Sequence, residues 1–162
     1  MIRDARGEDL AAIVEIYNAA IPGRLATADT APVPIDARRD WFARHTPSRH
    51  PLWVLERERS IAGWLGFEPF YGRPAYAATA ELSVYVAPRS RRTGVASALL
   101  ARAVETAPSL QLSTLLGFVF AHNAPSIALF ERFAFARWGH LPEVAELDGV
   151  KRDLLILGRH VT

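Results

Sequence analysis

The stretch Glu81–Leu100, ELSVYVAPRSRRTGVASALL, constrains the fold more than any other part of the chain. It begins with the alternation typical of a β-strand, passes through an arginine-rich loop that contains Gly94, and continues as an Ala- and Leu-rich helix. A strand that leads directly into a helix is a building block of α/β domains. Backbone N–H groups at the start of such a helix are unpaired and favour an anion. The segment therefore predicts an α/β fold with a diphosphate site at this turn.

Three arginines, Arg89, Arg91 and Arg92, precede Gly94 and would add positive charge to that site. The loop lacks the Gly-x4-Gly-Lys-Ser/Thr pattern of a Walker P-loop and the Gly-x-Gly-x-x-Gly pattern of a dinucleotide-binding turn. An arginine-rich solvated turn before an ordinary helix is the alternative, and the loop alone does not decide between the two.

The remaining patterns predict a mixed sheet with the element order β-α-α-β-β-β-α-β-α-β-β. The predicted helices span 8–20, 94–107 and 124–133, and Asp36 is expected to cap a further helix that carries Trp41 and Phe42. No linker interrupts residues 1–162, so a single domain is expected. The predicted strands are 2–5, 52–56, 61–67, 79–86 and 114–121, with Trp138 and 153–157 in the closing strands.

Composition excludes several classes of function. The chain has no cysteine, which excludes a disulfide scaffold, a thiolate metal site and a cysteine nucleophile. The net charge is only +2 and no basic stripe is interleaved with stacking aromatics, so no nucleic-acid partner is expected. The five histidines lack the spacing of a metal site. No apolar run reaches the length of a membrane span or forms a signal peptide, so we expect a cytoplasmic protein with no membrane partner.

Two motifs carry a family resemblance. Residues 91–96, RRTGVA, resemble the Gln/Arg-x-x-Gly-x-Gly/Ala signature of the GNAT superfamily of acyl-CoA-dependent N-acetyltransferases. Residues 123–126 and 129–135 resemble that family's Asn-x-x-Ser and Leu-Tyr-x-x-x-Gly-Phe segment, with Ala134 in place of the usual glycine. The resemblance to this superfamily covers nearly the whole chain, which is also similar to the phosphinothricin/methionine-sulfoximine acetyltransferase subfamily. The supporting stretches are 16–18, 27–30, 70–76, 79–81, 117–123 and 153–154.

The resemblance implies a GNAT fold, with a mixed, mostly antiparallel sheet of about seven strands and about four flanking helices. The sheet would splay at a cleft for acetyl-CoA, the implied co-substrate, with no metal. Asn123 has an alternative role as the cap of the helix that begins at Ala124, and one residue can do both. The implied cofactor-binding residues are Val84, Tyr85, Val86, Arg91, Arg92, Thr93, Gly94, Val95, Ala96, Ser97, Asn123, Ser126 and Phe130.

The resemblance also implies that Glu81 is the general base, which takes a proton from the acceptor ammonium directly or through a water. A carboxyl group among apolar strand residues is expected to have a raised pKa. A surface carboxylate paired with an arginine is the alternative. Phe130 replaces the tyrosine that often protonates the departing CoA thiolate, so Tyr85 and His122 are candidate substitutes, each with a purely structural alternative. With no cysteine, the acetyl group is expected to pass directly from CoA to the amine.

The implied acceptor is the α-amine of a small amino acid analogue of the phosphinothricin, methionine sulfoximine or methionine sulfone type. Arg73 suits its carboxylate, Tyr71 and Thr30 are further substrate-binding candidates, and residues 27–30 are expected to form the other wall. For Arg73, stacking on a nearby tyrosine is the alternative. Two alternative functions remain. The domain could acetylate another amine, such as a polyamine, an aminoglycoside or a protein N-terminus, or it could bind acetyl-CoA without catalysis. Relatives are commonly dimers, so a homodimer is expected.

Overall fold

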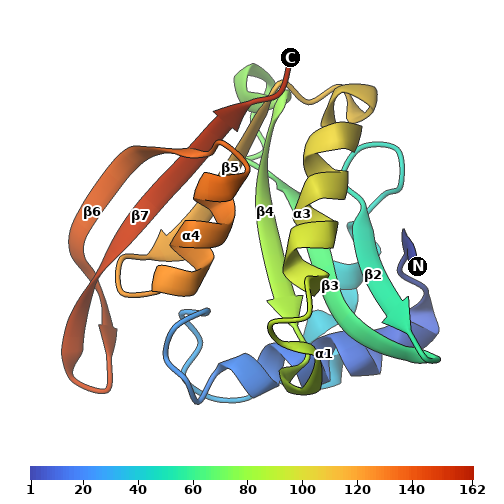
Figure 1. Cartoon of the computed structure of the whole chain (residues 1–162), viewed down its shortest axis with the longest axis horizontal. Helices are drawn as coiled ribbons and strands as arrows, with labels where there is room; N and C mark the ends of the chain where they lie inside the picture. Colours follow the sequence, from blue (N-terminus) through green and yellow to red (C-terminus); the bar gives the residue numbers. More distant parts are fainter.

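A seven-stranded mixed sheet, in the order β1-β2-β3-β4-β5-β7-β6, organises the computed structural model, which describes residues 1–162. Helices α1 (Leu10–Ala20), α2 (Arg39–Ala43), α3 (Val95–Thr106) and α4 (Ala124–Arg132) pack around it (Figure 1). The predicted order of strands and helices is confirmed. The strands are β1 (Ile2–Asp4), β2 (Leu52–Arg57), β3 (Ser60–Pro69), β4 (Thr79–Val86), β5 (Thr114–Phe120), β6 (Ala136–Leu147) and β7 (Val150–His160).

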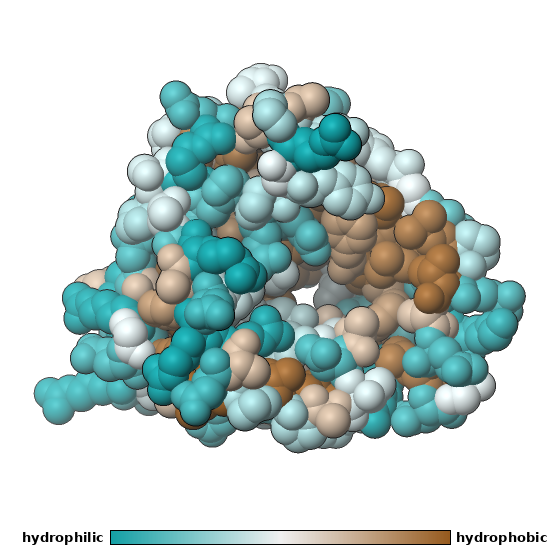
Figure 2. Space-filling view, turned by 180° about the vertical axis from the view of Figure 1, so that it is seen from behind, coloured by the Kyte–Doolittle hydropathy of each residue, from teal (hydrophilic) through white to brown (hydrophobic).

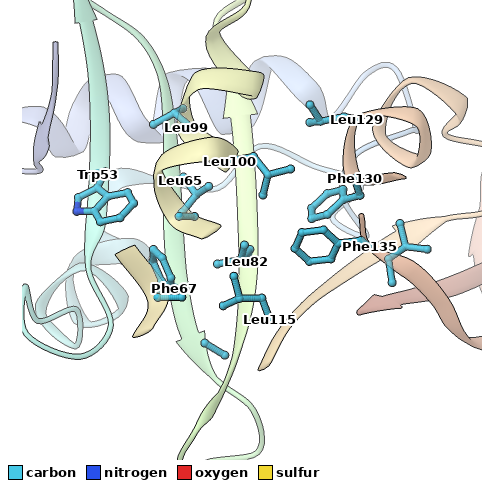
Figure 3. Close-up of a cluster of buried hydrophobic side chains, with 14 of the residues drawn as sticks. Trp53, Leu65, Phe67, Leu82, Leu99, Leu100, Leu115, Leu129, Phe130 and Phe135 are labelled. Carbon is cyan, nitrogen blue, oxygen red and sulfur yellow. The ribbon is translucent and has the colours of Figure 1, made fainter. Parts of the chain in front are cut away.

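Two hydrophobic cores lie on opposite faces of the sheet. On one face, α3 buries Leu99 and Leu100, one stripe of the helix, against β3 and β4. This larger core continues to Phe130 of α4, as Figure 3 shows. The smaller core, on the face covered by α1, contains Ile13 and Trp64. Figure 1 shows α3 and α4 in front of the sheet and α1 behind it.

The strands β4 and β5 are parallel neighbours that pair over only three residues, Thr79–Glu81 with Thr114–Leu116. Beyond Glu81 they diverge, while β4 stays paired with β3 and β5 stays paired with β7. Because the two strands are parallel, α3 and α4 both begin at the same end of the divergence. The fold therefore leaves one gap inside its sheet, with two helix N-termini at its open end.

The hairpin of β6 and β7 is longer than the sequence predicts. Most of β6 is exposed, so no run of buried residues marks it in the sequence. Gly139 and Pro142 interrupt its pattern and coincide with register shifts against β7, at 137–139 and 141–145. Bulges of this kind are where an edge strand tolerates glycine and proline.

The segment before α2 also differs from its prediction. Asp36 does not cap this helix, because it lies inside a 3-10 turn, Ile35–Arg38, that precedes α2. Its carboxylate instead accepts a hydrogen bond from Arg39 Nε at 2.7 Å. None of the helices is long and apolar enough to cross a lipid bilayer.

Candidate active site

A cavity of about 450 Å³ opens where β4 and β5 part. Its walls come from both strands, from the start of α4, from the β6–β7 hairpin and from the segment 25–28 after α1. Figure 2 shows a hollow near the middle of the molecule, with apolar surface on the side where β6 and β7 lie. Of the predicted site residues, the cavity brings together Glu81, Val84, Tyr85, Asn123, Ser126 and Phe130.

Glu81 lies half-buried at the point of divergence, as the last residue of β4 that pairs with β5. Its direct partner on β3 is Glu68, so both carboxyl groups lie on the same face of the sheet. Burial raises the pKa of Glu81, and the nearby charge of Glu68 raises it further. Glu81 takes part in no ion pair. The raised pKa agrees with the expectation for a base, and the alternative of an arginine-paired carboxylate is not found.

Tyr85 packs inward on the same face of β4 as Glu81. Its ring stacks on Trp64 with centroids 4.9 Å apart and meets Tyr17 edge-on at 5.1 Å. Its hydroxyl donates a hydrogen bond to the carbonyl oxygen of Ala26 at 3.0 Å. Burial raises the pKa of Tyr85, so the hydroxyl stays protonated at neutral pH. Tyr85 thus fixes the segment 25–28 against β4.

Two residues just after the end of β5, His122 and Asn123, bond the backbone of residues 24 and 25. His122 Nε2 lies 2.8 Å from the carbonyl oxygen of Arg24. Asn123 Nδ2 donates to the carbonyl oxygen of Leu25 at 3.1 Å, and its Oδ1 accepts from the backbone N–H of Ser126 at 3.3 Å. The helix-cap role of Asn123 is confirmed, while a contact with the cofactor stays a prediction. His122 therefore has a structural partner next to the cavity-wall segment 25–28.

Phe130 lines the cavity where the usual family tyrosine would stand, and its side chain is only 3% exposed. Its ring lies close to Gly117 of β5, where a Cβ would come within 2.8 Å of the ring atom Cε1. Phe135 packs edge-on against the same ring, with centroids 4.9 Å apart. The missing side chain at Gly117 therefore lets Phe130 occupy this position.

The loop before α3 leaves its backbone open to solvent. Residues 91–94 are exposed, and Gly94 adopts a left-handed conformation with φ 83°. A Cβ at Gly94 would meet no atom within 4 Å, so a ligand has room to approach the backbone there. Arg57 holds the loop by donating to Thr93 Oγ1 at 2.9 Å. This geometry suits the predicted diphosphate site.

Two residues near this loop have more limited roles than their sequence position suggests. The side chain of Val95 is buried in the core, so only its backbone can face a ligand. Arg89 donates to the carbonyl oxygen of Ile61 at 3.1 Å and lines a separate cavity between α1 and the β2–β3 turn. The three arginines therefore do not gather at one place, and Arg91 and Arg92 alone remain beside Gly94.

The predicted acceptor-binding residues Arg73, Tyr71 and Thr30 lie outside the cavity. Tyr71 is 77% exposed, and Arg73 is exposed in the loop between β3 and β4. The cation–π contacts of the chain are both made by Arg38, so the alternative in which Arg73 stacks on a tyrosine is not found. Thr27 lines the cavity, as expected for the second wall.

Sequence reasoning missed two parts of the site. One is the wall formed by β6 and β7, which includes Val144 and Leu154 and is signalled in the sequence only by the motif at 153–154. The other is Glu68, whose place opposite Glu81 depends on the register of β3 against β4, which no local pattern fixes. No group of His, Asp or Glu side chains is placed to hold a metal ion.

Comparisons with known proteins agree with this geometry. Residues 10–135 match the Acetyltransferase (GNAT) family. YwnH of Bacillus subtilis (strain 168), provisionally named a phosphinothricin acetyltransferase, is 49% identical over 162 residues, which cover 99% of each chain. The L-methionine sulfoximine/L-methionine sulfone acetyltransferase of Pseudomonas aeruginosa is 31% identical over 96% of this chain and 91% of its own.

A solved structure with acetyl-CoA shares the fold. It is the phosphinothricin acetyltransferase of the GNAT superfamily from Sinorhizobium meliloti, in complex with acetyl-CoA, and its TM-score is 0.93 at 26% sequence identity. The match covers 99% of this chain and 88% of that one. The opening between β4 and β5 thus belongs to a fold that accommodates this co-substrate.

Proposed function

Because this chain belongs to the GNAT acetyltransferase family, whose N-acetyltransferases use acetyl-CoA, we propose that it acetylates the α-amine of a small amino acid analogue. The names of relatives that align over nearly their whole length support phosphinothricin, methionine sulfoximine or methionine sulfone as the type of acceptor. One observation carries the proposal: the half-buried Glu81 stands, with a raised pKa, in a cavity at the divergence of β4 and β5.

The free edge of β4 supports a place for the co-substrate. Beyond Glu81 this strand has no partner on the side of β5, so the extended pantetheine arm would pair there like an added strand, along Val84 to Val86. The exposed backbone of Arg91 to Gly94 would receive the diphosphate at the N-terminus of α3. The thioester would then lie at the inner end of the gap, beside Glu81. Acetyl-CoA supplies the activated acetyl group in this arrangement.

In the proposed reaction Glu81 takes one proton from the acceptor ammonium, which leaves a neutral amine. The nitrogen lone pair forms the new C–N bond at the thioester carbonyl, and a backbone N–H near Val84 would stabilise the oxygen anion. The nitrogen gives up its second proton as the C–S bond breaks, and this proton passes through water to the departing CoA thiolate. The buried Phe130 has no proton to give. With no cysteine in the chain, no acyl-cysteine forms.

Arg73 remains our candidate for the acceptor carboxylate. Its guanidinium is exposed and enters no ion pair, so it is free to bind an anion. Because Arg73 lies outside the cavity, acceptor binding would involve its loop or a second subunit. A homodimer and a cytoplasmic location stay predictions from the sequence. Exposed apolar side chains on β6 and β7 support the dimer, namely Trp138, Leu141, Val144 and Val150.

The role of Glu81 is tested by Glu81→Gln. We expect turnover to fall by about 10²- to 10⁴-fold and the rise of kcat/KM with pH to disappear, because the base can no longer ionise. Thiol release across pH measures turnover, and isothermal titration should find acetyl-CoA affinity nearly unchanged. Glu105→Gln removes an exposed carboxylate of α3 and is the matched control for lost charge. A Glu81→Gln enzyme with the turnover and pH profile of the parent would disprove the assignment.

The acceptor is tested by a panel assayed with acetyl-CoA and thiol detection. We expect methionine sulfoximine, methionine sulfone and phosphinothricin to be acetylated in preference to spermidine, kanamycin or an alanine-terminated peptide. Arg73→Ala should mainly raise KM for the amino acid acceptors, since it removes a partner of their carboxylate. Activity confined to the polyamine, the aminoglycoside or the peptide would reject the proposed acceptor class.

A further inference from the structure

We propose that Glu68 is a positioning residue for Glu81: held by the indole of Trp41, its carboxylate places a second negative charge beside the base, and the pair together receives the proton that the acceptor ammonium loses. The inference rests on the proposed role of Glu81 as the base. It adds a part of the machinery that neither the sequence motifs nor the similarity to relatives assigns.

The register of the sheet sets the two glutamates side by side. Glu68 of β3 lies directly opposite Glu81 of β4, and the neighbouring pairs are Phe67 with Leu82 and Pro69 with Ala80, without a register shift. Directly opposed residues of an antiparallel pair have Cβ atoms roughly 4.5–5.5 Å apart and project from the same face. Two glutamates at that separation repel each other when both are ionised. The backbone therefore builds an unfavourable pair beside the cavity.

The carboxylate of Glu68 has one strong hydrogen-bond partner. The indole Nε1–H of Trp41 donates a hydrogen bond to Glu68 Oε1. That indole is itself fixed, because it packs edge-on against Trp64 with centroids 5.5 Å apart and against His45 at 4.8 Å. His45 Nδ1 also lies 2.9 Å from the carbonyl oxygen of Trp41. A fixed donor keeps the charge of Glu68 in place next to Glu81.

No cation neutralises Glu68. Glu68 lines a cavity of about 140 Å³ together with Arg44, His45 and His50, but none of these three forms an ion pair with its carboxylate. Burial lowers the pKa of both histidines, so they are uncharged at neutral pH. β5 places the apolar Leu116 opposite Glu81. The other charged or titratable groups nearby come from two places. Arg38 and Arg44 lie near α2, and His45, Arg49 and His50 lie in the segment that leads to β2.

The pair has a clear chemical purpose. A glutamate with an ordinary affinity for protons is a weak base at neutral pH, whereas a second carboxylate makes Glu81 hold a proton more strongly and so accept it more readily from the ammonium. The proton taken from the acceptor is then shared by Glu68 and Glu81 until it leaves to solvent, and the pair returns to its starting charge. Such a pair titrates as one unit.

Two substitutions test this by moving the pH profile in opposite directions. Glu68→Gln removes the second charge, so the rise of kcat/KM with pH should move to lower pH by about one unit, with a reduced plateau. Trp41→Phe removes the donor that stabilises the doubly ionised pair, so the rise should move to higher pH. Glu105→Gln should leave the rise where it is in the parent. If the two substitutions merely disordered the site, they would not shift the pH at which kcat/KM rises in opposite directions.

The outcomes separate this inference from the proposed function. If Glu81→Gln abolishes the rise but Glu68→Gln leaves it at the pH of the parent, Glu81 is the base and the pair is refuted. If kcat/KM of the Glu81→Gln enzyme still rises with pH as in the parent, Glu81 is not the base, and the proposed mechanism fails independently of Glu68. Carbon-13 NMR of the glutamate carboxyl groups in the unsubstituted protein gives a readout that needs no variant. We expect the Glu81 signal to titrate in two steps coupled to Glu68, and a single step with an ordinary midpoint would overturn the proposal.

Discussion

The contact between Gly117 and Phe130 predicts that Gly117→Ala destabilises the protein and disturbs the cavity. The new Cβ would lie 2.8 Å from Cε1 and 2.9 Å from Cζ of the phenyl ring. Carbon atoms pack best at roughly 3.5–4.0 Å, so the ring must move by about 1 Å. Phe135 packs against this ring with centroids 4.9 Å apart, so the movement has no free space on that side.

The cost follows from overpacking a filled core. Inserting one methyl group where side chains cannot yield costs about 1–3 kcal/mol. We expect a loss of about 2 kcal/mol for Gly117→Ala, which at this chain length lowers Tm by about 4–8 °C. The ring would be pushed towards the cavity that it lines, so KM for acetyl-CoA should rise as well.

Urea denaturation gives the free energy of unfolding, and a double-mutant cycle isolates the contact. Phe130→Leu shortens the side chain and should cost about 1 kcal/mol by itself. In the double variant the shorter side chain makes room for the new methyl group, so the two losses should fall short of additivity by about 1–2 kcal/mol. A Gly117→Ala protein as stable as its parent, or strictly additive losses, would refute the packing argument.

Two further predictions concern the ends of α4. Ala134 follows this helix with φ 61°, a left-handed conformation that glycine adopts without strain. Ala134→Gly should therefore stabilise the protein by about 0.5–1 kcal/mol and raise its Tm, and an unchanged or lower Tm would contradict this. Asn123→Ala removes both the helix cap and the hydrogen bond to the segment 25–28. It should lower the free energy of unfolding by about 1 kcal/mol and speed amide hydrogen exchange in that segment. Unchanged exchange would show that this hydrogen bond does not hold the segment in place.

The sequence predicts those parts of the fold that depend on local patterns. The alternation of β4 and the helical stripe of α3 can be read directly, as can the turn at Gly94 between them. The register of β3 against β4 cannot, because it is set by packing on both faces of the sheet, and so Glu68 opposite Glu81 was missed. The hairpin of β6 and β7 was only partly predicted, because an exposed edge strand shows no buried stripe.

The same distinction between local and long-range features applies to the candidate site. Glu81 and the loop of α3 come from motifs that are continuous in sequence, and the structure places them along one gap. The inward packing of Tyr85 could not be predicted from its own strand, because it depends on Tyr17 of α1 and Trp64 of β3. Side chains whose environment is assembled from distant elements are those on which the sequence is least informative.

The short pairing of β4 with β5 also has a mechanical consequence. Three residue pairs join two half-sheets, one that carries α1 to α3 and one that carries α4 with the β6–β7 hairpin. Across the open end, side-chain bonds tie the halves together. Arg24 pairs with Asp148 at 2.8 Å, the Asn123 side chain bonds the backbone of Leu25, and Arg132 of α4 donates to Ser97 of α3 at 3.3 Å. A co-substrate that spans this gap would act as a brace between the halves, so that loading the enzyme stiffens it and releasing CoA allows the halves to flex apart.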